Sequence, residues 1–232
     1  MVNDTYCAAP FRHLAVSNQS DCDWLPCCSW LGDGIPRSED PFNGPMMTDL
    51  RQRMLDGRGH PSCQRCYNNE KNGGFSNRMK FNLEHGRPDV QMVTDIEFNL
   101  GNLCNLKCRM CSSTYSSRWI ADDKLLGNAQ TPLTRRTIDQ LGVDPANLTN
   151  IKFIGGEPTL EQDTMADVLS TIERLRGGLG HLNVELVTNG MLPFRDDLID
   201  MLLRCGKTWL SVSIDGMHVS HAYQRTGGDL DV

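Results

Sequence analysis

Three cysteines within eight residues constrain the fold of this chain more than any other feature of its sequence. Cys104, Cys108 and Cys111 form a C-x-x-x-C-x-x-C pattern directly after a strand-like run at residues 94–100. A compact loop in this place can direct three thiolates at three corners of a [4Fe–4S] cube. The fourth iron would then keep an open coordination position for a substrate. The alternatives are a zinc site, which usually uses C-x-x-C pairs, and buried thiols without a metal.

The cysteine content favours metal binding over disulfide bonds. The chain has ten cysteines among 232 residues and a formal net charge of -6. Its N-terminus lacks the basic and apolar segments of a signal peptide, and no apolar run approaches the roughly 18 residues that span a membrane. We therefore expect a cytoplasmic protein with reduced thiols. The acidic balance predicts neither a nucleic-acid nor a membrane partner.

The chain divides into two expected domains, residues 1–92 and 93–232, which differ in their content of turn residues and in their hydrophobic periodicity. The first is rich in turn residues, with one helix expected at residues 47–55, and it has little core to bury. The second alternates strand-like runs with helices, which favours right-handed βαβ units and a parallel sheet. Its expected strands cover residues 94–100, 150–156, 182–190 and 207–216, and its expected helices cover residues 119–126, 165–175 and 195–205.

Polar motifs follow the last three of these strands. They are "GGEP" at residues 155–158, "TNG" at 188–190 and "SVSIDG" at 211–216. Two glycines let a backbone approach a ligand closely, and a carboxylate or carbonyl oxygen accepts hydrogen bonds from a cation. Each motif alone is also compatible with ordinary turn chemistry or a solvent-facing strand. Next to a cysteine loop, they predict one ligand site at the strand ends.

The cysteine loop and the three strand-end motifs, in this order, resemble the radical S-adenosylmethionine (SAM) enzymes over roughly residues 93–232. The resemblance implies an α/β fold built as a partial (β/α) barrel. It also implies that the open iron chelates the amino and carboxylate groups of SAM. One electron from the cluster then cleaves the C5′–S bond, and the 5′-deoxyadenosyl radical abstracts hydrogen from a substrate. A reducing protein such as flavodoxin or ferredoxin is the implied electron donor.

The same resemblance assigns roles to individual residues. Cys104, Cys108 and Cys111 would ligate the cluster, and Met110 stands where the family often has an aromatic residue near the adenine. The "GGEP" motif would bind the SAM ammonium group, and "TNG" would form the floor of the pocket. Ser213 would contact the SAM ribose or carboxylate, and Asp215 would do the same or bind substrate. The other residues assigned to SAM are Gly155, Gly156, Glu157, Thr188, Asn189, Ser211, which shares a strand face with Ser213, and Arg225, which could instead lie on the surface.

A second group of cysteines lies in the first domain. Cys63 and Cys66 form a C-x-x-C knuckle, which is a strong metal signal in a reducing compartment. With Cys7 and Cys27 they would complete a four-thiolate site that ties distant loops together. Cys28 could replace Cys27 as a ligand. Four thiolates suit Zn²⁺ and [4Fe–4S] equally well.

These N-terminal segments resemble the auxiliary-cluster segments called SPASM or twitch. The resemblance favours a second [4Fe–4S] cluster over zinc, as an electron acceptor or a structural element. Such segments commonly follow the SAM core, whereas this one precedes it. Cys22 and Cys205 are expected to be structural thiols.

The expected barrel is short by the family pattern, because only about four βα units are expected where the family usually has six. A fragment, a natural short form and an assembly completed by another chain all explain this. We expect a radical SAM enzyme that acts on a peptide or small molecule, without an assignable catalytic residue. The alternatives are a non-catalytic iron–sulfur protein, one part of a larger assembly, and a zinc-stapled structural protein.

Overall fold

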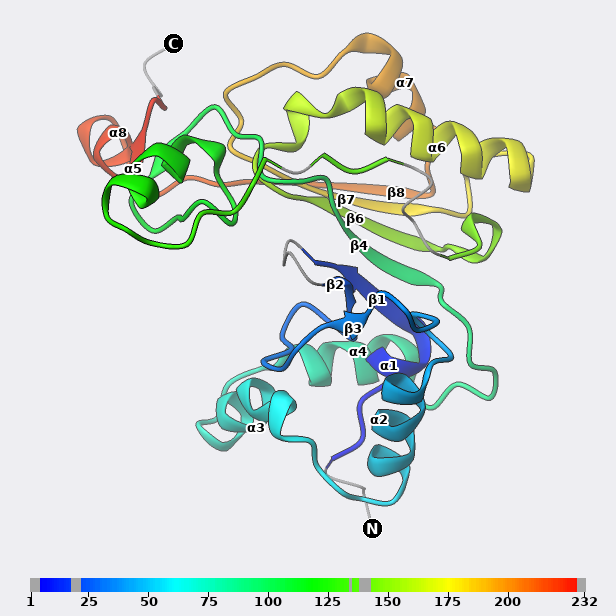
Figure 1. Ribbon diagram of the computed structural model, residues 1–232. Helices are drawn as coiled ribbons and strands as arrows, with labels where there is room; N and C mark the ends of the chain where they lie inside the picture. Colours follow the sequence, from blue (N-terminus) through cyan, green and yellow to red (C-terminus); the bar gives the residue numbers. More distant parts are fainter. Residues whose placement is uncertain (1–4, 18–21, 134, 138–142, 229–232) are drawn as a thin grey trace. The chain divides into compact units, whose positions relative to one another are not determined.

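A computed structural model describes residues 5–17, 22–133, 135–137 and 143–228 (Figure 1). The chain forms two compact units, Met1–Glu97 and Phe98–Val232. The division falls inside strand β4 (Asp95–Asn99), close to the expected boundary between residues 92 and 93. Within the first unit the strand order is β3 (Ile35–Pro36), β2 (Cys22–Leu25), β1 (His13–Val16) and β4. Within the second unit β4 is followed by β6 (Asn150–Ile154), β7 (Asn183–Thr188) and β8 (Lys207–Val212). The expected α/β class with a largely parallel sheet is confirmed.

The first unit holds more regular structure than the sequence predicted. Strand β1 pairs in parallel with β4, with Leu14 opposite Ile96, and antiparallel with β2, which in turn pairs antiparallel with β3. These strands are too short for their alternation to stand out in the sequence. The elements of this unit before β4 are α1 (Ala9–Arg12), β1 (His13–Val16), β2 (Cys22–Leu25), β3 (Ile35–Pro36), α2 (Pro45–Leu55), α3 (Gln64–Lys71) and α4 (Asn77–His85).

Helix α2 is the helix expected at residues 47–55. Met47, Leu50 and Met54 are buried along one face, while Leu55 is exposed. Arg51 is buried on the same helix, where its Nε donates to the carbonyl oxygen of Pro10 at 2.7 Å. The buried guanidinium of Arg51 therefore has a hydrogen-bond partner and lies within the small apolar core of this unit.

The second unit is built on parallel strands. Ile151, Val184 and Thr208 are neighbours across β6, β7 and β8. Figure 1 shows α6 and α7 on one face of these strands, and α6 buries Met165 and Val168 toward the core. The elements after β4 are β5 (Lys107–Cys108), α5 (Ile120–Leu125), β6 (Asn150–Ile154), α6 (Gln162–Arg176), β7 (Asn183–Thr188), α7 (Asp196–Leu203), β8 (Lys207–Val212), α8 (Val219–Gln224) and β9 (Arg225–Thr226).

Strand β8 lies at the edge of the sheet. It pairs with β7, and every residue from Lys207 to Val212 is exposed, including Trp209 and Leu210 at about half of their surface. Among the described residues, β4, β6, β7 and β8 are the strands that match the expected series. An exposed apolar edge agrees with the partial barrel that the sequence predicted.

Candidate cluster and cofactor site

The cysteine loop starts at the end of β4 and is held by the turn after β6. The backbone N–H of Gly156 donates to the carbonyl oxygen of Gly101, and that of Glu157 donates to the carbonyl oxygen of Leu103, both at 2.8 Å. The "GGEP" turn and the first residues of the loop are therefore joined backbone to backbone.

Two glycines make this joint possible. A Cβ atom at Gly156 would lie 2.1 Å from the carbonyl oxygen of Leu103, and one at Gly155 would lie 2.8 Å from that of Gly101. Gly155 also has φ +147°, a value that other residues rarely adopt. The sequence predicted a close backbone approach here, to a ligand. In the structure the backbone that these glycines approach is the cysteine loop itself.

The three thiols of the loop lie near one another in a protected place. Cys108 is buried, and Cys104 and Cys111 are half-buried. Burial raises the pKa of all three thiols, and the charges of neighbouring thiolates raise the pKa of Cys111 further. A residue that follows the three cysteines also holds the loop, because Trp119 Nε1 donates a hydrogen bond to the carbonyl oxygen of Cys108 at 2.9 Å.

This donor set fits a cube-shaped cluster better than a single ion. Within the described residues, no three His, Cys, Asp or Glu side chains gather tightly enough to hold one metal ion. A [4Fe–4S] cluster differs because each thiolate binds a different iron, so its three cysteines stand further apart. Cys104, Cys108 and Cys111 would hold such a cluster, which would deprotonate their thiols on binding.

Glu157 links the ends of β6 and β7. Its carboxylate is buried, and Oε1 accepts hydrogen bonds from Thr159 Oγ1 at 2.7 Å and Thr188 Oγ1 at 2.6 Å. Oε1 also accepts from the backbone N–H of Thr159, and Oε2 accepts from the backbone N–H of Asn189 at 2.7 Å. The carboxylate is thus largely committed to the protein. The Gly155 and Gly156 carbonyls are the other acceptors that this motif offers to an ammonium group.

The network extends from Asn189 to the cysteine loop. The Nδ2 atom of Asn189 donates a hydrogen bond to Asn105 Oδ1 at 2.8 Å. The backbone carbonyl oxygen of Thr188 accepts a hydrogen bond from the backbone N–H of Ser213 at 2.9 Å. Glu157, Thr188 and Asn189 therefore meet beside the loop, as the sequence predicted for one site. Thr159 and Asn105 complete it. Sequence reasoning missed both, because Asn105 occupies a variable position between Cys104 and Cys108 and Thr159 directly follows the "GGEP" motif.

The remaining predicted cofactor residues divide into two groups. Asp215 Oδ2 lies 2.8 Å from Arg225 Nε, and Arg225 Nη1 lies 3.8 Å from Cys108 Sγ, so Arg225 connects Asp215 to the cysteine loop. Ser211 is exposed on β8, and Met110 exposes 61% of its surface. Their assignment to SAM stays a prediction.

The N-terminal cysteines come together within the first unit. Cys7 is buried, and burial raises the pKa of its thiol to about 12, with further contributions from Cys63 and Cys66. Burial also raises the pKa of Cys27, which Cys7, Cys28 and Cys63 raise further. Cys7 thus interacts electrostatically with Cys27, Cys63 and Cys66, and Cys27 also interacts with Cys28. The side chain of Cys22 lies outside the described residues, and Cys205 is half-buried after α7.

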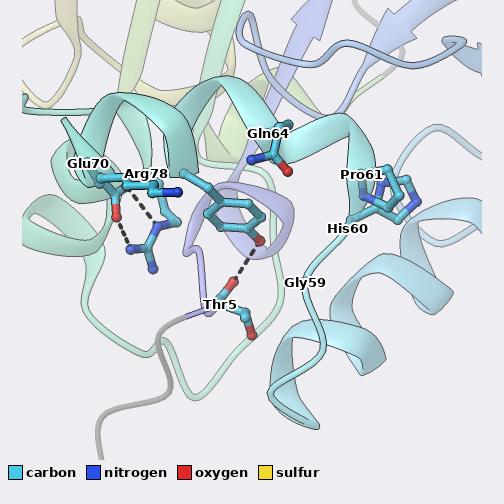
Figure 2. Close-up of a pocket in the computed structure, with 9 residues that line it drawn as sticks. Thr5, Gly59, His60, Pro61, Gln64, Glu70 and Arg78 are labelled. Carbon is cyan, nitrogen blue, oxygen red and sulfur yellow. Dashed lines mark hydrogen bonds and ion pairs between the residues drawn. The ribbon is translucent and has the colours of Figure 1, made fainter.

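A hollow of about 840 Å³ adjoins the cysteine knuckle in the first unit (Figure 2). Tyr67 lines it, and its hydroxyl donates to the carbonyl oxygen of Thr5 at 3.5 Å. Burial, and then the charge of Cys63, raises the pKa of Tyr67 to about 12. Figure 2 shows Arg78 paired with Glu70 at the rim. Sequence reasoning did not identify this hollow, because its lining comes from segments with no shared motif.

Comparison with known proteins decides the family. A family model described as the radical SAM superfamily matches residues 98–229, more than half of the chain. This chain belongs to the radical SAM superfamily. Membership implies SAM and a [4Fe–4S] cluster as cofactors and confirms the resemblance drawn from the motifs. The matched residues do not include the N-terminal cysteines, so the twitch-like assignment stays a prediction.

Several relatives of this radical SAM chain are GTP 3′,8-cyclases. The protein from Mycobacterium ulcerans is 32% identical over 130 residues, which cover 56% of this chain and 33% of the relative. The protein from Corynebacterium glutamicum is 28% identical over 127 residues, covering 54% and 32%. The chain thus spans about a third of the length of these relatives. In the described part of the chain, no helix is long and apolar enough to cross a membrane.

Proposed function

We propose that this chain reductively cleaves SAM at the cysteine loop and uses the resulting radical to abstract hydrogen from a substrate. The observation that carries the proposal is the set of three protected thiols joined to the "GGEP" turn through Gly156 and Glu157. A [4Fe–4S] cluster bound there supplies the electron that breaks the C5′–S bond of SAM. Cys104, Cys108 and Cys111 hold that cluster, and no further cysteine of the loop is available for its fourth iron.

The chain's own residues shape the SAM site. The network of Glu157, Thr188 and Asn189 fixes the ends of β6 and β7 against the loop. The backbone carbonyls of the glycine turn accept the SAM ammonium group, and Ser213 lies on the segment after β8, where it can meet the other polar groups of SAM. Met110 packs near the adenine through its polarizable side chain.

The N-terminal unit carries an auxiliary [4Fe–4S] cluster on Cys7, Cys27, Cys63 and Cys66. The electrostatic interactions that link these thiols support this role, and so does their resemblance to twitch segments. Four cysteine ligands leave no iron open for a substrate. Held by these four cysteines, such a cluster would accept an electron from a substrate radical or stabilise the unit.

The substrate is a peptide or a small molecule. Because several relatives are named GTP 3′,8-cyclase, GTP is the first small molecule to test. A flavodoxin- or ferredoxin-like protein would supply the reducing electron. The second candidate function is a cluster-binding protein that does not cleave SAM. The exposed face of β8, including Ser211, supports this alternative, because a SAM-binding strand is expected to be covered.

The test is an anaerobic assay of the reconstituted chain. The protein is loaded with iron and sulfide, reduced and mixed with SAM, and 5′-deoxyadenosine is quantified. We expect product that disappears in Cys104→Ala but persists in Cys205→Ala, whose thiol lies away from the loop after α7. Iron bound at the loop without any 5′-deoxyadenosine would favour the second candidate. A colourless protein that binds zinc alone would contradict both.

A further inference from the structure

A short strand pairing ties the end of α8 to the cysteine loop. Strand β9 runs antiparallel to β5, with Arg225 opposite Cys108 and Thr226 opposite Lys107. The backbone N–H of Arg109 also donates to the carbonyl oxygen of Gln224 at 2.8 Å. The backbone therefore holds Arg225 beside a cluster-ligating cysteine, independently of its side chain.

The side chain of Arg225 is held between a carboxylate and a thiol. It is 15% exposed, with Nε 2.8 Å from Asp215 Oδ2 and Nη1 3.8 Å from Cys108 Sγ. A guanidinium presents several donors in a fixed plane, so one edge can face Asp215 while another faces sulfur. Asp215 thus orients the guanidinium and offsets part of its charge.

We propose that Arg225 is a positioning residue that raises the reduction potential of the cluster at the cysteine loop, and that Asp215 moderates this effect. The inference rests on the proposed function, because it requires a cluster on Cys108. Reduction adds one negative charge to the cluster, and a nearby positive charge stabilises the reduced form more than the oxidised form. A hydrogen bond to a ligating sulfur acts in the same direction.

This assignment gives Asp215 and Arg225 a role different from direct contact with SAM. Arg109 offers a matched comparison, because it carries the same charge and lies next to Cys108 in the cysteine loop itself. Its guanidinium stacks on Tyr223, with a distance of 3.7 Å to the ring centroid, and its Nε donates to the Tyr223 carbonyl oxygen at 2.9 Å. It is exposed. Solvent should therefore screen its charge from the cluster.

The experiment is an anaerobic redox titration of the reconstituted full chain without SAM, followed by electron paramagnetic resonance (EPR). The signal of the loop cluster is identified as the one lost in Cys104→Ala. In Arg225→Gln we expect about a tenfold lower ratio of reduced to oxidised cluster at a fixed potential, equal to a shift of about 59 mV for one electron. Arg225→Lys should fall between wild type and Arg225→Gln, and Arg109→Gln should match wild type.

Asp215→Asn supplies a second test with the opposite sign. Removing the carboxylate leaves the guanidinium charge unbalanced, so the reduced fraction should rise. A role limited to holding the loop together would not give opposite shifts in the two variants. If Arg225→Gln loses its cluster, the Asp215→Asn titration decides, and an unchanged potential there overturns the proposal. An Arg225→Gln variant that keeps its cluster at an unchanged potential also overturns the role of Arg225, but it does not contradict SAM cleavage. Wild-type protein that binds no cluster at the loop overturns both the role of Arg225 and the proposed function.

Discussion

The carboxylate of Glu157, after β6, accepts a hydrogen bond from the backbone N–H of Asn189, after β7, at 2.7 Å. The same carboxylate accepts bonds from Thr159 and Thr188 through its other oxygen. Because Asn189 then reaches Asn105 in the cysteine loop, one buried side chain links two strand ends to the proposed cluster site.

Glu157→Gln should destabilise the second unit. Both oxygens of the Glu157 carboxylate accept hydrogen bonds from buried donors of the protein. In glutamine an NH₂ group, which cannot accept, replaces one of these oxygens, so at least one buried donor loses its partner. We expect the free energy of unfolding to fall by about 2–3 kcal/mol, as measured by urea denaturation. Glu185→Gln is the control, because Glu185 forms a half-exposed ion pair with Lys152 at 3.0 Å. That pair should be worth under about 1 kcal/mol. Equal effects of the two substitutions would refute this account of Glu157.

Gly156→Ala should disturb the cysteine loop. Its new methyl group would lie 2.1 Å from the carbonyl oxygen of Leu103, so the loop backbone must move. We expect weaker retention of loop iron and a loss of about 2 kcal/mol or more in the free energy of unfolding. Gly180→Ala is the matched control, since nothing lies within 4 Å of a Cβ atom there. Iron retention like that of wild type in Gly156→Ala would show that the joint does not shape the loop.

The first unit should lose stability as the pH rises above about 6.5. Nε2 of His85 lies 3.4 Å from Oδ1 of Asp95. The Asp95 carboxylate raises the pKa of His85 above its usual value of 6.5. A raised pKa contributes stability that is complete below the unfolded value and is lost as pH rises through the folded value. Burial would raise the pKa of Asp95, but hydrogen bonds from His85 and Thr94 lower it overall. Its contribution is therefore lost only in acid, as pH falls through a value below 3.8.

Thermal unfolding of the first unit, followed from pH 5.5 to 8.5, checks this prediction. His85→Gln should flatten the decline in the midpoint temperature. His60→Gln is the control, because burial lowers the pKa of His60 and its contribution to stability has the opposite sign. The decline should remain, or steepen, in that variant. A decline that persists unchanged in His85→Gln would assign the pH dependence to another group.

Cys63→Ala should remove the auxiliary cluster alone. We expect wild-type protein to bind about eight iron atoms and the variant about four, because each [4Fe–4S] cluster contributes four. Cys205→Ala should keep the full iron content, since its half-buried thiol lies after α7. Zinc with only four iron atoms in wild type would assign the N-terminal site to zinc.

The sequence predicted the parts of the fold that follow strong periodicity. The run at residues 165–175 became α6, with Met165, Val168, Leu169 and Ile172 buried. The strand expected at 182–190 became β7, with alternate residues buried. Strands β1 to β3 were not anticipated, because two to four residues carry no readable alternation.

Motifs in the sequence indicated candidate site residues but not which of them contact one another. Gly155 and Gly156 were expected to approach a ligand, whereas their contacts are with the loop backbone. Arg225 was expected to meet a carboxylate of SAM or substrate, or to lie on the surface, and it pairs with Asp215 of the same chain. Such pairings depend on how separate strands align in space, which a single sequence does not specify.

The most direct test of the central claim is the EPR spectrum of the reduced loop cluster, recorded with and without SAM. If Cys104, Cys108 and Cys111 leave one iron open, SAM binds that iron and changes the spectrum. The change should be present in Cys63→Ala, which keeps only the loop cluster, and no loop signal should remain in Cys104→Ala. A loop cluster whose spectrum is the same with saturating SAM would contradict the account.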